Sequence, residues 1–120
     1  MQRRRRPEQQ IQRAVFDHLR SRGMPDTFAF HVPNGGKRKP IEAAILKGLG
    51  VRAGVPDIFA VRGGKCFAIE LKADNGRPTT GQLECLAALD KAGAFTAICY
   101  GLDPALRVLE AWGLLRGRAT

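Results

Sequence analysis

Three charged residues near the middle of the chain have types and spacing that could do chemistry. Asp57 precedes one apolar run, and Glu70 and Lys72 lie two residues apart in the next. Between the two runs, residues 63–64 are both glycine, which is a strong signal for a β-hairpin turn. A hairpin closed there brings Asp57 opposite Glu70. Carboxylates about 5 Å apart repel by roughly 3 kcal/mol at an effective dielectric near 20, so something should offset that repulsion.

A divalent cation is the natural partner of two such carboxylates. Hard oxygen ligands are the kind that Mg²⁺ or Mn²⁺ prefers, and the bound ion would also stabilise charge on a reacting phosphate. Lys72 lies on the same face of the strand as Glu70, where it could orient or deprotonate the attacking water, or stabilise negative charge. Together with the basic character of the chain, these three residues predict phosphodiester hydrolysis. The alternative is a solvated ion pair on an edge strand, with Asp57 merely opening a strand.

The charge balance points to a polyanionic partner. Twenty Lys and Arg residues stand against eleven Asp and Glu, which gives a formal net charge of +9. A small domain this basic usually meets phosphate backbones. With one Tyr and one Trp in the chain, we expect contact with a duplex backbone rather than stacking on splayed bases.

Composition also limits the class of protein. The 120 residues fit one domain, 1–120, in which residues 1–6 form a basic and flexible tail. No apolar run approaches the roughly 20 residues of a membrane span, and the N-terminus lacks the apolar segment of a secretory signal. The three cysteines lie apart without C-x-x-C spacing, as expected of core residues in a reducing compartment.

The periodicity of the chain predicts alternating helices and strands. Helices are expected over residues 7–22, 40–49, 79–91 and 104–112, and strands over 27–32, in the hairpin within 54–73, and over 94–100. Thr79 and Gln82 form a capping box, and Asp103 with Pro104 reads as an N-cap followed by proline at N1. Both faces of the hairpin are mainly apolar, which predicts cover on both sides. The fold class is therefore α/β, with a mixed central β-sheet of about four strands flanked by helices.

The combined motifs resemble the VRR-NUC family of the PD-(D/E)XK nuclease superfamily. The resemblance rests on Pro56-Asp57, Glu70-Leu71-Lys72, HVPNGG (31–36), GVRAGVPD (50–57), Thr79 with Gln82, and Gly93, and it extends over residues 8–111. It implies a restriction-endonuclease-like core.

The resemblance also implies roles for individual residues. Asp57 and Glu70 would be metal ligands together with the backbone carbonyl of Leu71, and Lys72 would be the catalytic lysine. Glu8 matches a carboxylate on the first helix, and Gln82 matches a glutamine on the helix after the hairpin. Glu8 could instead complement a helix dipole, and Gln82 could serve only its capping box.

A second set of residues is expected to contact DNA. The set consists of His31, Asn34, Lys37, Arg38, Lys39, Arg52 and Gly54. Alternatively, His31 and Asn34 could be structural residues at a strand end and in a turn, and Gly54 could be an ordinary turn residue.

Together these features predict an intracellular Mg²⁺- or Mn²⁺-dependent DNA endonuclease of a phage or a bacterial host cell. Branched DNA, as a Holliday junction or a flap, is the expected substrate, with a helicase or a replication or repair protein as a possible partner. Two symmetric cuts need two sites, which favours a homodimer. The apolar surplus of helix 104–112 and of Leu114 and Leu115 would supply its interface. A non-catalytic DNA-binding module and an RNA-processing nuclease are the alternatives.

Overall fold

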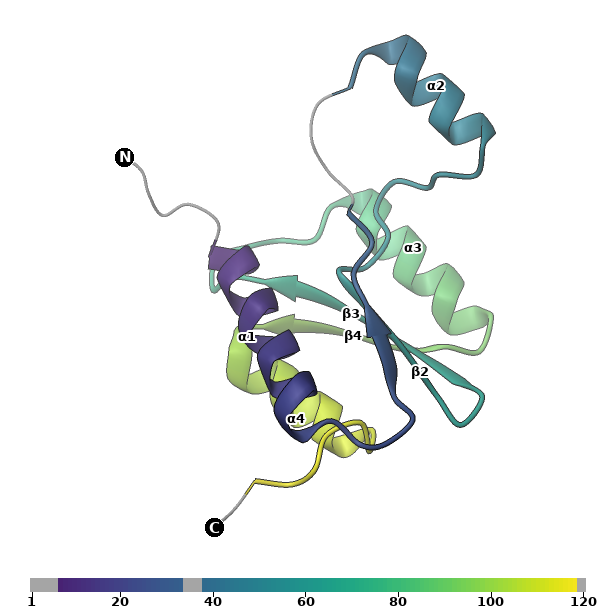
Figure 1. Ribbon diagram of the computed structural model, residues 1–120. Coiled ribbons are helices and arrows are strands. Elements are labelled where there is room, and N and C mark those ends of the chain that lie inside the picture. Colours follow the sequence, from purple (N-terminus) through teal and green to yellow (C-terminus); the bar gives the residue numbers. More distant parts are fainter. Residues whose placement is uncertain (1–6, 34–37, 119–120) are drawn as a thin grey trace.

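The computed structural model of the chain describes residues 7–33 and 38–118 (Figure 1). The predicted residues Asn34 and Lys37 and the basic tail lie outside these described residues. The order of elements agrees with the order expected from the sequence. It runs α1 (Pro7–Arg22), β1 (Phe28–Phe30), α2 (Pro40–Gly48), β2 (Ile58–Arg62), β3 (Lys65–Lys72), α3 (Thr80–Lys91), β4 (Phe95–Tyr100) and α4 (Leu102–Ala111).

The strands form a mixed four-stranded sheet in the order β1-β2-β3-β4, which confirms the predicted fold class. Strands β1, β2 and β3 pair antiparallel, whereas β3 and β4 pair parallel. The hairpin register is the predicted one, with Ile58 opposite Ile69 and Arg62 opposite Lys65. Gly63 and Gly64 both have positive φ, 59° and 77°, as a tight two-residue hairpin turn requires.

Helices α1 and α4 pack together on one face of the sheet and enclose the main core (Figure 1). Leu106 and Leu109 of α4 are buried there, as are Leu114 and Leu115 beyond it. Trp112 packs against the same core, with its ring 5.3 Å from that of Phe67. The expectation that these residues supply spare apolar surface for a dimer interface was therefore wrong, because the chain's own core absorbs them.

Helix α3 covers the other face of the sheet only over β3 and β4. The sequence predicted that both faces of the hairpin are covered. One face is covered by α1 and α4, but on the other face α3 covers β3 and not β2. A helix is about 10 Å wide and adjacent strands lie about 4.8 Å apart, so one helix covers roughly two strands. Over β1 and β2 this face stays open, with Phe28, Phe30 and Val61 exposed.

Helix α4 begins earlier than its sequence signal suggested. Its N-cap is Gly101, so the prediction of Asp103 as N-cap and Pro104 at N1 was wrong. Gly101 has a φ of 104°, and its N–H donates to the carbonyl of Lys72 at 3.0 Å, which turns the chain directly from β4 into the helix. Pro104 is still accommodated because it lies in the first turn, where backbone N–H groups have no intrahelical acceptor.

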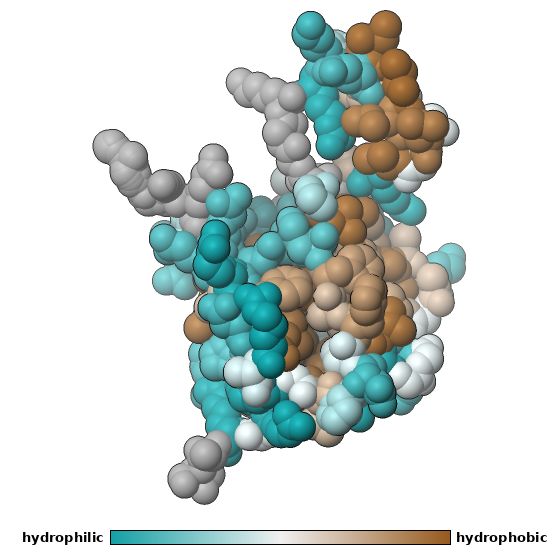
Figure 2. Space-filling model, in the orientation of Figure 1, coloured by the Kyte–Doolittle hydropathy of each residue, from teal (hydrophilic) through white to brown (hydrophobic). Residues whose placement is uncertain are grey.

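Helix α2 stands away from the sheet, and none of its nine residues is buried (Figure 1). Ile41, Ile45 and Leu49 are exposed and recur at every fourth position, which places them along one side of the helix. They form an apolar stripe, visible as the hydrophobic side of α2 in Figure 2. In the part of the chain that the structure describes, no helix is long and apolar enough to cross a membrane.

Candidate active site

Glu70 and Lys72 lie buried at the end of the central strand β3. Their exposed fractions are 2% and 7%, and Nζ of Lys72 lies 3.5 Å from Oε2 of Glu70. Because β3 has paired neighbours on both sides, the alternative of a solvated pair on an edge strand is wrong. The register decides this arrangement, since it places both residues on the face that α3 only partly covers.

Asp57 lies just before β2, at the same end of the hairpin. Its Oδ2 accepts a hydrogen bond from the backbone N–H of Leu71 at 2.8 Å. Burial raises the pKa of Asp57 above its usual value, although that bond opposes the shift. Burial and, next, the neighbouring charge of Asp57 raise the pKa of Glu70 to about 7, against the opposing effect of Lys72. The expected juxtaposition of the two carboxyl groups is present.

One oxygen of this pair has no hydrogen-bond partner. Oε1 of Glu70 is buried and unsatisfied among the described residues. Leaving such an acceptor without a partner is costly, and a cation would relieve both this cost and the repulsion from Asp57. The described chain holds no group of three or more His, Cys, Asp or Glu side chains that could bind a metal. Two carboxylates with a backbone carbonyl still fit Mg²⁺, which usually retains several waters.

Glu8, in the first turn of α1, also lies beside this site. Its Oε2 accepts a hydrogen bond from the backbone N–H of Ala73 at 3.3 Å, directly after Lys72. A Cβ added to Gly76 would lie 3.1 Å from that oxygen and 3.3 Å from Cδ of Lys72, so a glycine lets the loop close over both side chains. The first turn of α1 thus contacts the end of β3, and a catalytic role for Glu8 stays a prediction.

Gln82 forms the capping box that its sequence predicts. The Thr79 N–H donates to Oε1 of Gln82 at 2.8 Å, and the Gln82 N–H donates to Oγ1 of Thr79 at 3.1 Å. The same turn of α3 packs against Gly54, where a Cβ would lie 2.6 Å from the carbonyl oxygen of Gly81. With a φ of 80°, Gly54 is therefore required by packing. A DNA contact by Gly54 and a catalytic role for Gln82 stay predictions.

His31 has a structural contact that sequence reasoning missed. Its Nδ1 lies 2.6 Å from the backbone carbonyl oxygen of Asp57, so it links the end of β1 to the residue that carries the first carboxylate. The two residues lie 26 positions apart, and only the pairing of β1 with β2 brings them together. His31 is exposed, and a contact with DNA remains a prediction.

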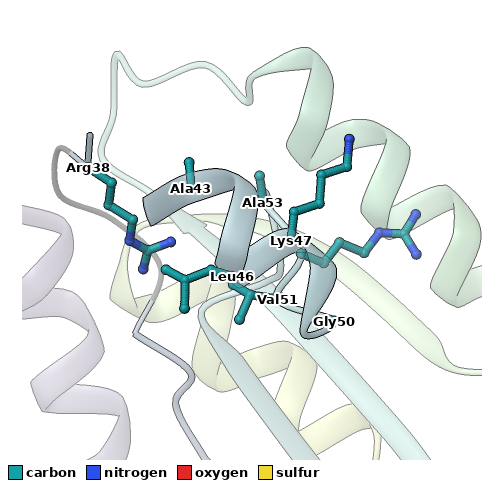
Figure 3. Close-up of a pocket in the computed structure, with 8 residues that line it drawn as sticks. Arg38, Ala43, Leu46, Lys47, Gly50, Val51 and Ala53 are labelled. Atoms are coloured by element: carbon teal, nitrogen blue, oxygen red, sulfur yellow. The ribbon is translucent and has the colours of Figure 1, made fainter. Parts of the chain in front are cut away.

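The described basic candidates lie around α2 rather than on the sheet. Arg38 and Arg52 line a cavity of about 560 Å³ at this helix, and Lys39 directly precedes it (Figure 3). Lys47, which was not among the predicted residues, lines the same cavity and extends from α2 in Figure 3. The remaining lining residues are Ala43, Leu46, Gly50, Val51 and Ala53.

Comparison with known proteins places the fold. A solved structure described as a VRR_NUC domain protein has a TM-score of 0.70 and 27% identity, covering 86% of this chain and 84% of its own. The structure of Archaeoglobus fulgidus Hjc, a Holliday junction resolvase from an archaeal hyperthermophile, has a TM-score of 0.49 and 20% identity, covering 78% and 67%. No protein-family model and no curated protein matches the chain. The first likeness confirms the resemblance to VRR-NUC proteins and the PD-(D/E)XK-like fold.

Proposed function

We propose that this chain is a single-domain, metal-dependent endodeoxyribonuclease that hydrolyses phosphodiester bonds in branched DNA. The observation that carries the proposal is the interaction of Asp57 with the buried Glu70, whose Oε1 is unsatisfied and which has Lys72 beside it. Burying charged groups costs free energy, and replacing a buried ion pair by apolar residues of similar size is often possible without loss of stability. A buried cluster of charged side chains therefore suggests a functional role. Their presence in a chain of net charge +9 supports phosphodiester chemistry.

The side chains of the candidate site would have different roles in the reaction. Asp57, Glu70 and the carbonyl of Leu71 would hold Mg²⁺ or Mn²⁺, which supplies a water of lowered pKa and stabilises charge on the phosphate. Lys72 supplies N–H donors that orient the attacking water and stabilise the phosphate oxygens. His31 holds the backbone of Asp57, and Glu8 holds the backbone just beyond Lys72, so both act as positioning residues.

We propose that two copies of the chain form a homodimer. Two symmetric cuts in a four-way junction require two sites in fixed relation, which a two-fold dimer provides. The apolar stripe of α2 (Ile41, Ile45, Leu49) is the surface that supports this proposal, in place of the buried residues of α4. A nine-residue helix is marginal in water without tertiary packing, so a second copy against the stripe would stabilise it.

One experiment separates this function from its alternatives. Labelled duplex, four-way junction, flap and RNA substrates of matched sequence are incubated with the chain and Mg²⁺ or Mn²⁺, beside the Glu70→Gln variant. We expect cleavage of the branched DNA and none by the variant. Binding without cleavage by the unaltered chain would identify a DNA-binding module, and preferential cleavage of RNA would identify an RNA-processing nuclease.

A further inference from the structure

Three phenylalanines lie on the open half of the sheet face that carries Glu70. Phe28 and Phe30 in β1 are 69% and 37% exposed, and Phe59 in β2 is half-buried beside them. Their ring centroids follow one another at 5.6 and 5.5 Å, and the rings of Phe30 and Phe59 are nearly parallel, at 10°. We call these three residues the aromatic strip. In Figure 2 the surface over β1 and β2 is a hydrophobic area below α2.

The aromatic strip is continuous with the candidate active site. Phe59 follows Asp57 by two positions, so both side chains point to the same face of the sheet. Phe30 pairs directly with Phe59, and Phe28 pairs with Val61 one step further out. The strip therefore begins beside the carboxylates and leads away from them along β1. A DNA strand with its phosphate at the carboxylates has its neighbouring bases within reach of the rings.

The chemistry of the strip suits nucleotide bases better than a protein partner. A protein covering Phe59 would also crowd Asp57, the adjacent residue on that face, and would close the site to its substrate. The open positions of β1 and β2 on this face are Phe28, Phe30, Phe59 and Val61, which include no acidic side chain to repel a phosphate. Aromatic rings on a sheet face stack bases regardless of sequence, because every base has a π-face.

We propose that the aromatic strip stacks unpaired bases of the strand being cut, so that the favoured DNA has single-stranded nucleotides next to the scissile phosphate. The choice of this substrate rests on the proposed nuclease function, whereas the stacking itself does not require cleavage. Bases inside a duplex are already stacked and cannot reach the rings. The expectation of duplex backbone contact rested on the single Tyr and the single Trp of the chain. The exposed rings of Phe28 and Phe30 and the half-buried ring of Phe59 supply the aromatic surface that those two residues do not.

The test uses a single strand that contains 2-aminopurine, whose fluorescence is quenched when it stacks. It is titrated with the full chain in EDTA, where a metal-dependent nuclease cannot cut. The variant Phe28→Leu keeps an apolar side chain but removes the ring. The matched control is Phe95→Leu, because Phe95 is 43% exposed on the opposite face of the same sheet. We expect quenching by the unaltered chain and the control, and a Kd about tenfold weaker for Phe28→Leu.

Three outcomes would overturn the proposal. The first is that the unaltered chain does not quench the fluorescence, and the second is that Phe28→Leu binds the strand as tightly as the unaltered chain does. The third is that Phe28→Asp changes the oligomeric state while its affinity for DNA is unchanged. The last would identify the strip as a contact between copies. Cleavage assays keep the two proposals apart. Quenching without cleavage in Mg²⁺ supports the strip and rejects the nuclease, whereas cleavage without quenching rejects only the strip.

Discussion

The carboxylate of Asp57 accepts a hydrogen bond from the backbone N–H of Leu71 at 2.8 Å, across the hairpin. A side chain at the start of one strand is thus held by the main chain of its partner. This bond keeps Asp57 beside Glu70, whose other neighbour on the same strand is Lys72. The site therefore depends on the register of a rigid hairpin rather than on a loop, and a one-residue slip would turn Glu70 and Lys72 to the opposite face.

Removing the charge of Glu70 while keeping its shape should abolish cleavage. We expect Glu70→Gln to lower kcat at least about 100-fold, the scale of losing one group that stabilises the transition state. Affinity for DNA should be kept or increased, because a negative charge near a phosphate is gone. Rates on a labelled junction are compared with those of Glu84→Gln, an exposed residue of α3. Equal rates for both variants would refute the assignment.

Without divalent cations, the free energy of unfolding should depend on the protonation of Glu70. Burial and the charge of Asp57 raise its pKa from 4.5 to about 7, so the folded state binds this proton more tightly than the unfolded state. Proton binding by Glu70 therefore adds to the free energy of unfolding in full below pH 4.5. This contribution, up to about 3 kcal/mol, is lost as the pH rises through about 7. Denaturant unfolding in EDTA at several pH values measures the loss. Glu70→Gln should flatten the curve, and an equally steep curve in the variant would contradict the prediction.

Divalent metal should be required for cleavage and should stabilise the fold. Mg²⁺ or Mn²⁺ should support activity, whereas Ca²⁺ should allow DNA binding without turnover, since it takes more ligands at longer distances. Mn²⁺ should raise Tm more at pH 8 than at pH 5.5, because protonated Glu70 is a poor ligand. Thermal unfolding of the unaltered chain and of Glu70→Gln checks this. Undiminished cleavage in excess chelator would exclude the metal.

Neutralising the basic residues before α2 should weaken DNA binding at every sequence. The triple change Lys37→Gln, Arg38→Gln and Lys39→Gln should reduce the slope of log K against log salt by up to about 0.9 per lost phosphate contact on duplex DNA. Arg13→Gln on α1 serves as a control for the loss of positive charge elsewhere. An unchanged slope in the triple variant would show that this segment lies off the path of the DNA.

A charge in the apolar stripe of α2 should break the proposed dimer. We expect Ile45→Asp to be monomeric at micromolar concentration while the unaltered chain sediments as a dimer. Ala43→Asp adds the same charge on the opposite side of the helix and should leave the dimer intact. Sedimentation equilibrium with and without a four-way junction measures this. A monomeric unaltered chain under both conditions would favour a flap or nicking nuclease.

Local patterns in the sequence determined the elements and the centre of the candidate site. Gly63 and Gly64 defined a turn with one favoured register. That register pairs Ile58 with Ile69, so that Asp57 and Glu70, the next residues outward, lie close enough to interact. Thr79 and Gln82 gave the start of α3 because a capping box satisfies backbone groups within four residues. Such features depend on neighbours in the chain, so they can be predicted from short stretches of it.

Other features were decided only by how the elements pack. The contacts of Glu8 with Ala73 and of His31 with Asp57 join residues 65 and 26 positions apart. The cap of α4 moved to Gly101 because the path from β4 into the helix outweighed the local signal of Asp103. Periodicity shows that a helix or a strand has an apolar face, but only the arrangement of all elements determines what covers it. For that reason Leu106 and Leu109 of α4, which were predicted to be free for a dimer interface, are buried in the core. The apolar stripe of α2 and most of the aromatic strip are exposed instead.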